Sequence, residues 1–329
     1  MSNLTCGSRI DIERFTSYNF IFSLIVGSSA VVSTYVSTVL AIYAIAKRSI
    51  FEMSTKLLLY QILFNAVLYQ TAYLYEVIQL FYKAFFKLDE PCELLKTEES
   101  CFLHFNVFII STSAMIYGKT GLMLERACAT FLKSCNKSIL LKISIAIFIC
   151  VFVLSSQTGL MLTWDDTLNG SAYACYMVPK KSVTRATRFF VVCTILILMN
   201  MLLLCLIVRH NKRFQYANRF SVNERFHKHQ VIESTMTICI LNAVLFVLVL
   251  TYTIGIGVLL NIKSILSHFW FTAIISWVYT IPYMALAIPV ILIVRIKISR
   301  ATRITLISVI SKTQQTQDDH MNQIKKMWE

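Results

Sequence analysis

Long apolar blocks alternate with short polar segments along the whole chain. A hydrocarbon core of about 30 Å is crossed by ~20 helical residues, and seven blocks reach that length. The blocks are continuously apolar rather than alternating, which predicts helices and not the strands of a membrane barrel. We place the spans near Phe20–Ala46, Leu57–Phe81, Phe102–Leu124, Ile143–Leu162, Phe189–Val208, Thr235–Leu260 and Phe269–Val294.

The composition agrees with this pattern. Hydrophobic residues make up 57% of the chain and charged residues only 15%, whereas a soluble domain carries roughly 25% charged residues. No linker-like stretch divides the 329 residues. We therefore expect an all-α membrane protein with one seven-transmembrane bundle spanning residues 1–329. The first block is too long for a cleavable signal and follows a polar segment, so the first span is predicted to act as its own insertion signal.

The distribution of charge predicts the orientation of the bundle. With the N-terminus outside, the cytosolic segments hold 20 Lys/Arg and seven Asp/Glu, and the exterior segments hold ten and nine. A Lys/Arg excess retains loops on the cytosolic side. We expect an extracellular N-terminus and a cytosolic tail, residues 295–329. Anionic membrane lipid and a cytosolic partner are then enough to explain the net charge of +14, and binding to nucleic acid is not needed to explain it.

Two glycosylation sequons fall on the predicted exterior, at Asn3 and Asn169. Both are candidate glycosylation sites. A third sequon, at Asn136, falls on the predicted cytosolic side. Because such triplets also occur by chance, they support the orientation only weakly.

The third span carries the most informative spacing. It begins at Cys101 and ends at Glu125–Arg126, about 37 Å farther along a helix. A disulfide from Cys101 to Cys175 would pin the second exterior loop across the bundle. Pairing with Cys92 or Cys6 stays open, because four exterior cysteines allow three arrangements. The arrangement is similar to the layout of G-protein-coupled receptors, with Glu-Arg where rhodopsin-like members have Asp-Arg-Tyr.

Three short runs carry a closer resemblance, namely TCGS with ERFTS at 5–17, LERACAT at 124–130 and NRFSVNERF at 218–226. The chain resembles the nematode serpentine receptor class alpha chemoreceptors over its whole length. The resemblance implies a receptor in the plasma membrane of chemosensory neurons. Such a receptor binds an external small molecule and activates a cytosolic heterotrimeric G protein. The seventh span has Pro282-Tyr283 and Pro289 but no Asn-Pro-x-x-Tyr, so rhodopsin-like activation rules are not transferred closely.

The third cytosolic loop, Arg209–Ser234, has six Lys/Arg and three His against two Glu. In a receptor it forms part of the landing site for a G protein, although a charge cluster that only fixes topology would look the same. We expect Arg126 to contact an acid near the base of span six, Glu233 or Glu224, in the resting state. The same coupling region includes Glu125 and two loop arginines, Arg219 and Arg225.

Polar residues within spans are costly in lipid and are therefore candidate functional residues. The outer half of the bundle is the expected ligand pocket. Its predicted wall consists of Glu76, His104, Asn106, Trp270 and Trp277. The two tryptophans also fit interfacial anchors. Lys119 lies two turns from the inner face and is expected to extend its ammonium to the cytosolic headgroups.

No motif for enzyme chemistry, cofactor or metal binding is present. The alternative from another class is a transporter or channel, although we detect no internal repeat. In the tail, basic and apolar residues interleave from about Ser299 to Ile310. This pattern predicts an amphipathic helix lying along the inner leaflet.

Overall fold

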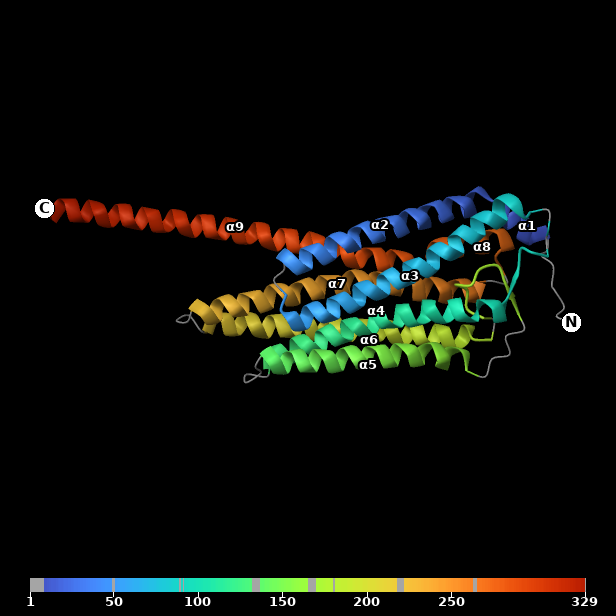
Figure 1. Ribbon diagram of the computed structural model, residues 1–329, viewed down its shortest axis with the longest axis horizontal. Coiled ribbons are helices and arrows are strands. Elements are labelled where there is room, and N and C mark those ends of the chain that lie inside the picture. Colours follow the sequence, from blue (N-terminus) through green and yellow to red (C-terminus); the bar gives the residue numbers. More distant parts are fainter. Residues whose placement is uncertain are drawn as a thin grey trace.

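In a computed structural model, described for residues 9–48, 51–88, 90, 92–131, 137–164, 170–179, 181–217, 222–262 and 265–328, the chain forms an elongated helical bundle (Figure 1). Its elements in order are α1 (Arg9–Thr16), α2 (Tyr18–Arg48), α3 (Met53–Phe86), β1 (Lys96–Thr97), α4 (Glu98–Phe131), α5 (Lys137–Thr163), β2 (Ser171–Ala172), α6 (Val183–Ala217), α7 (Val222–Ile262), α8 (His268–Val278) and α9 (Ile281–Trp328). Seven helical stretches within these residues can cross a membrane by length and composition. Six of the predicted spans lie inside them, and the seventh overlaps the stretch Ala273–Thr302.

Large apolar side chains cover the outside of the bundle. Phe64, Phe152 and Leu206 expose 65%, 62% and 61% of their surface on three different helices. In water such a surface would drive aggregation, whereas lipid solvates it without cost. The seven-helix membrane bundle is thus confirmed.

Helix α4 lies at the centre and contacts α3, α5, α6 and α7. Ser111, Thr112 and Ser113 are all buried on it, because neighbouring helices surround it on several sides. Gly118 allows α3 to come close. A Cβ at this position would lie 2.7 Å from Cγ1 of Ile62, too short for any real contact.

The seventh span is broken between α8 and α9, at Tyr279 and Thr280. Pro282 in the first turn of α9 suits a helix start, because that position needs no backbone N–H. Two neighbouring helices hold the break. The Thr280 hydroxyl donates to the carbonyl of Leu248 on α7 at 2.7 Å, and the Gln70 amide on α3 donates to the carbonyl of Pro282 at 2.8 Å.

Helix α9 continues without interruption from the seventh span into the tail. Its 48 residues correspond to about 72 Å, and its C-terminal part projects beyond the end of the bundle (Figure 1). The tail is helical, as predicted, but the prediction that it turns to lie along the membrane surface is wrong. No Gly or Pro follows Pro289, so nothing in the sequence interrupts the helix where the span ends.

Candidate functional site

The two strands lie at the end of the bundle that also holds α1, which we call the sheet end. There β1 pairs with β2 in antiparallel register, with Lys96 opposite Ala172. The pairing joins the segment after α3 to the segment after α5. Two more hydrogen bonds extend it, since the Glu98 N–H donates to the Gly170 carbonyl at 2.9 Å and the Gly170 N–H donates to the Glu98 carboxylate at 3.1 Å.

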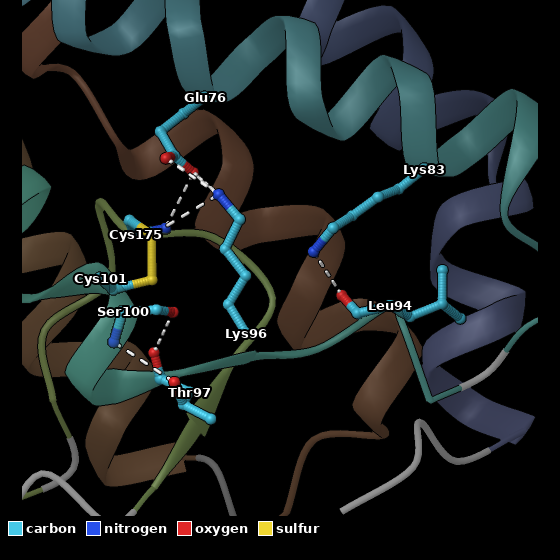
Figure 2. The surroundings of a disulfide bond; sticks show 8 residues. All are labelled: Glu76, Lys83, Leu94, Lys96, Thr97, Ser100, Cys101 and Cys175. Atoms are coloured by element: carbon cyan, nitrogen blue, oxygen red, sulfur yellow. Dashed lines mark hydrogen bonds and ion pairs between the residues drawn. A yellow bond between two sulfur atoms is a disulfide. The ribbon is translucent and has the colours of Figure 1, made fainter. Parts of the chain in front are cut away.

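A disulfide joins Cys101, in the first turn of α4, to Cys175, with sulfur atoms 2.03 Å apart. The predicted pairing is confirmed, and the alternative bridges from Cys101 to Cys92 or Cys6 are excluded. Cys92 is itself disulfide-bonded. The Cys101–Cys175 bridge fixes the segment after β2 over the sheet end of α4 (Figure 2).

The carboxylate of Glu76 holds the same segment from the α3 side (Figure 2). It is fully buried and lies 3.2 Å from the Lys96 ammonium. It also accepts the backbone N–H of Cys175 at 3.1 Å. A buried carboxylate needs such partners, because an unpaired charge away from water is very costly. Glu76 therefore anchors the loop rather than standing free for a ligand.

A cavity of about 270 Å³ opens beside this anchored loop. Its walls come from α2, α3, α6, α7, α8, α9 and the segment after β2, and no acidic or basic side chain is among the described residues that line it. Tyrosines dominate its polar groups, namely Tyr73, Tyr173, Tyr176, Tyr252, Tyr279 and Tyr283. It is the largely apolar kind of cavity with a few polar groups that binds small molecules.

Tyr279 connects this cavity to the break in the seventh span. It lies between α8 and α9, and its ring stacks on Tyr176 with centroids 4.9 Å apart. Its hydroxyl shares a hydrogen bond of 2.7 Å with that of Tyr69 on α3. Tyr252 of α7 meets it edge-on at 6.0 Å. A molecule that contacts the Tyr279 ring in the cavity can thus act on α3 through Tyr69, on α7 through Tyr252 and on the start of α9.

None of the five residues predicted as the pocket wall lines this cavity, so the predicted wall is corrected. Glu76 is engaged by Lys96, and His104 stacks on Tyr75 at 4.8 Å. Asn106 donates to the Phe102 carbonyl of its own helix. The two tryptophans are substantially exposed, Trp270 by 59% and Trp277 by 41%, and Trp277 donates its indole N–H to Asn19. Their exposure fits the alternative that they are interfacial anchors.

At the other end of the bundle, which we call the arginine end, Arg126 lies fully buried at the centre of a polar cluster. Its guanidinium binds both oxygens of the Glu125 carboxylate and the hydroxyl of Thr55 on α3. Another nitrogen donates to the hydroxyl of Ser234 on α7 at 3.0 Å. Ser54 and Thr55 complete the cluster by donating to Glu125. The cluster joins α3, α4 and α7 through one cation.

Of the two acids expected to contact Arg126, Glu233 is therefore corrected, whereas Glu224 is not tested. The contact is made by Ser234, whereas no ion pair to its neighbour Glu233 occurs within the described part of the chain. The two positions differ by one residue, or about 100° around a helix. Glu224 and Arg225 lie in α7, but their side chains are outside the described residues, and Arg219 is outside them altogether.

The prediction that the Lys119 ammonium extends to the headgroups is wrong. Lys119 lies on α4, two turns from Arg126 towards the cavity. Its side chain is fully buried, and its ammonium has no hydrogen-bond partner in the described part of the chain. Asn242 of α7 is also fully buried, with both amide atoms unpaired among the described residues. The interior of the bundle between the cavity and the Arg126 cluster thus contains polar groups that have no partner among the described residues.

Comparison with known proteins decides the family. The model of the serpentine type 7TM GPCR chemoreceptor Sra family matches residues 1–328. The chain belongs to this family. Serpentine receptors class alpha-8 and alpha-3 of Caenorhabditis elegans are 41% and 40% identical to it, each over the full length of both chains. Class alpha-4 of the same species is 39% identical, again over all of both chains.

Membership in the Sra family makes the chain a multi-pass membrane protein of a chemoreceptor class, and it replaces the transporter or channel alternative. The Cys101–Cys175 bridge predicted from the positions of the cysteines is present in this Sra chain. The predicted glycosylation sites, Asn3 and Asn169, lie outside the described residues.

Proposed function

We propose that the chain is a chemosensory receptor that binds an external small molecule in the tyrosine-lined cavity and activates a heterotrimeric G protein at the arginine end. In this proposal the sheet end faces the exterior of the plasma membrane, and the arginine end faces the cytosol. Membership in the chemoreceptor family supports the class of function, and the Lys/Arg excess in the loops supports the orientation.

One observation carries the link between the two ends. Helix α7 lines the cavity with Tyr252 and contacts Arg126 through Ser234. These two residues of α7 are about 27 Å apart along the helix. A ligand that shifts Tyr252 therefore acts on the same rigid element that is held to α4 at the other end. Since interfaces of packed helices have discrete arrangements, a small displacement at the cavity can release this contact.

The cavity has a second route to the arginine end. Tyr279 shares its hydrogen bond with Tyr69 on α3, and α3 also supplies Thr55 to the Arg126 cluster. A ligand against Tyr279 thus bears on two of the helices that meet at Arg126. Release of the cluster would free the cytosolic ends of α4 and α7 to bind a G protein.

The test is a chemical screen in cells that express the receptor together with a promiscuous Gα subunit, with second-messenger output as the readout. We expect at least one chemical to raise the signal only when both the receptor and the Gα subunit are present. A variant without Arg126, R126A, lacks the contact that holds α4 to α7, so it should reach the surface and show raised output before any chemical is added. A receptor that is present at the surface and responds equally without the Gα subunit would overturn the G-protein part of the proposal.

A further inference from the structure

We infer that the cavity takes a small, uncharged and mostly apolar ligand that carries a hydrogen-bond acceptor. The inference rests on the proposed function, because it treats this cavity as the ligand site. It is drawn from three properties of the cavity wall, which are its lack of charge, its size and the unused hydroxyl groups within it.

The absence of charge excludes ionic ligands on energetic grounds. No Asp, Glu, Lys, Arg or His is among the described residues that line the cavity. The buried carboxylate of Glu76, which holds the adjoining loop, is already engaged by Lys96 and by the Cys175 N–H. An ammonium or carboxylate group entering the cavity would lose its hydration and gain no counter-charge, which is strongly unfavourable in an apolar environment.

The volume of the cavity limits the size of the ligand. An apolar cavity of roughly 150 Å³ in another protein holds benzene. The present cavity measures about 270 Å³. It therefore fits a molecule of one ring with a short substituent, or an aliphatic chain of similar size.

The hydroxyl groups of the wall indicate which polar group the ligand carries. Ser23, Thr187 and Thr253 each donate to a carbonyl of their own helix. The hydroxyl of Tyr279 is paired with that of Tyr69. Tyr73, Tyr252 and Tyr283 also line the cavity, and their hydroxyls make no hydrogen bond within the described part of the chain. Tyrosine hydroxyls are donors that a carbonyl, ester or ether oxygen can accept.

Four probes of one-ring size separate these properties, namely acetophenone, ethylbenzene, benzoate and benzylammonium. The measurement is the saturable rise in melting temperature of the full-length receptor in lipid nanodiscs as each probe is added. We expect acetophenone to bind at least about tenfold more tightly than either ion, because the ions lose hydration without gaining a partner. We expect it to bind several-fold more tightly than ethylbenzene, which corresponds to one neutral hydrogen bond.

Variants assign the effect to this cavity. Thr187→Phe fills part of it and should abolish saturable binding of acetophenone and ethylbenzene. Val192→Phe, on the exposed face of the same helix, is the matched control and should leave both unchanged. The triple variant Tyr73→Phe/Tyr252→Phe/Tyr283→Phe should remove the preference for acetophenone over ethylbenzene while ethylbenzene still binds.

Each outcome decides the inference. Equal or tighter binding of benzoate or benzylammonium would contradict it, as would acetophenone binding that is absent or that persists unchanged in Thr187→Phe. The probes are measured on purified receptor without a G protein. Failure of the inference is therefore distinguishable from failure of the proposed function, which is measured in cells. A G-protein response to a charged chemical would overturn the inference and leave the proposed function standing.

Discussion

Lys119 is the residue whose burial has the clearest consequence for stability. Its ammonium is fully buried and has no acceptor among the described residues, so it lowers the stability of the resting bundle. Replacing it with methionine, which has a similar length and no charge, should stabilise the fold by at least about 1–3 kcal/mol. We expect a higher melting temperature for Lys119→Met in nanodiscs. Lys212→Met, at an exposed position on α6, should change little, and a lower melting temperature for Lys119→Met would show that the ammonium has a stabilising partner.

Glu76 and Lys96 allow a second test at the level of single residues. Lys96→Met would leave the fully buried Glu76 carboxylate with the Cys175 N–H as its one hydrogen-bond partner among the described residues. Breaking one side of a buried pair costs about 3–5 kcal/mol, so the melting temperature should fall. The double variant Glu76→Gln/Lys96→Met keeps an acceptor for the N–H without a charge, and it should recover much of the loss.

An exposed pair supplies the control for that test. Lys87 lies 2.8 Å from Glu90 and 3.0 Å from Glu93 at the surface, and hydrogen bonds to both acids raise its pKa. Solvent screens such pairs, so Lys87→Met should change the melting temperature little. If Lys87→Met and Lys96→Met have equal effects, then burial is not what makes the Glu76 pair important.

At the scale of elements, the contact between α4 and α7 is expected to set the resting state. Ser234→Ala removes the hydroxyl that Arg126 contacts on α7. A loss of about 1 kcal/mol from the resting state shifts the balance several-fold towards the released arrangement. We expect basal second-messenger output to rise accordingly. Thr235→Ala is the matched control, because within the described part of the chain that buried hydroxyl bonds only the Val231 carbonyl of its own helix. Equal output from the two variants would show that the contact does not control signalling.

Helices α6 and α7 carry a pair of thiols that can report on the same movement. The sulfur atoms of Cys205 and Cys239 lie 3.6 Å apart. A membrane-permeant oxidant that removes two electrons and two protons would join them as a disulfide and fix α7 to α6. Ligand-evoked output should then fall, while the Cys239→Ser variant keeps its response under the same oxidant. An unchanged response in the oxidised receptor, with the cross-link shown by mass mapping, would mean that α7 need not move away from α6.

The elements themselves could be predicted from the sequence, but the direction in which their faces point could not. A span must contain about 20 apolar residues in any bundle, so six predicted spans lie within the observed helices. The apolar residues cover these helices nearly all round, and periodicity therefore does not show which side faces the interior. Trp277 and Tyr252 look alike in sequence as aromatic residues near the outer ends of spans. Only the packing shows that Tyr252 lines the cavity and that Trp277 faces outward.

For the Arg126 cluster too, the sequence predicts the position of the cluster but not which residues of the neighbouring helices contact it. Its position was predictable, because Glu125–Arg126 ends a span that begins at a cysteine. Its partner was not, because charge alone favours Glu233, whereas the helix presents Ser234. The cluster also includes Ser54 and Thr55 of α3, and no sequence motif predicts that these two hydroxyls take part. Contacts between distant helices depend on their rotation, which a single sequence does not specify.

At the scale of the whole molecule, the proposed function requires the sheet end to face the exterior. The disulfide-bonded sheet end suits an oxidising environment. The other end carries the Lys/Arg-rich loops, where a cytosolic location is favoured. The projecting C-terminal part of α9 leaves the bundle on that same side (Figure 1). The disulfide and the charges of the loops thus support the proposed orientation, which places the tail in the cytosol.

This orientation can be tested on intact cells. An epitope tag after residue 329 should resist added protease until the membrane is permeabilised, while a tag before residue 1 should be removed at once. Attachment of glycan at Asn3 should slow migration of the receptor on a gel, and Asn3→Gln should reverse that shift. Asn136→Gln is the matched control, because glycosylation enzymes act only on the lumenal side and this sequon falls on the predicted cytosolic side. Protection of the N-terminal tag, or glycan at Asn136, would invert the bundle, and the tyrosine-lined cavity would then open to the cytosol.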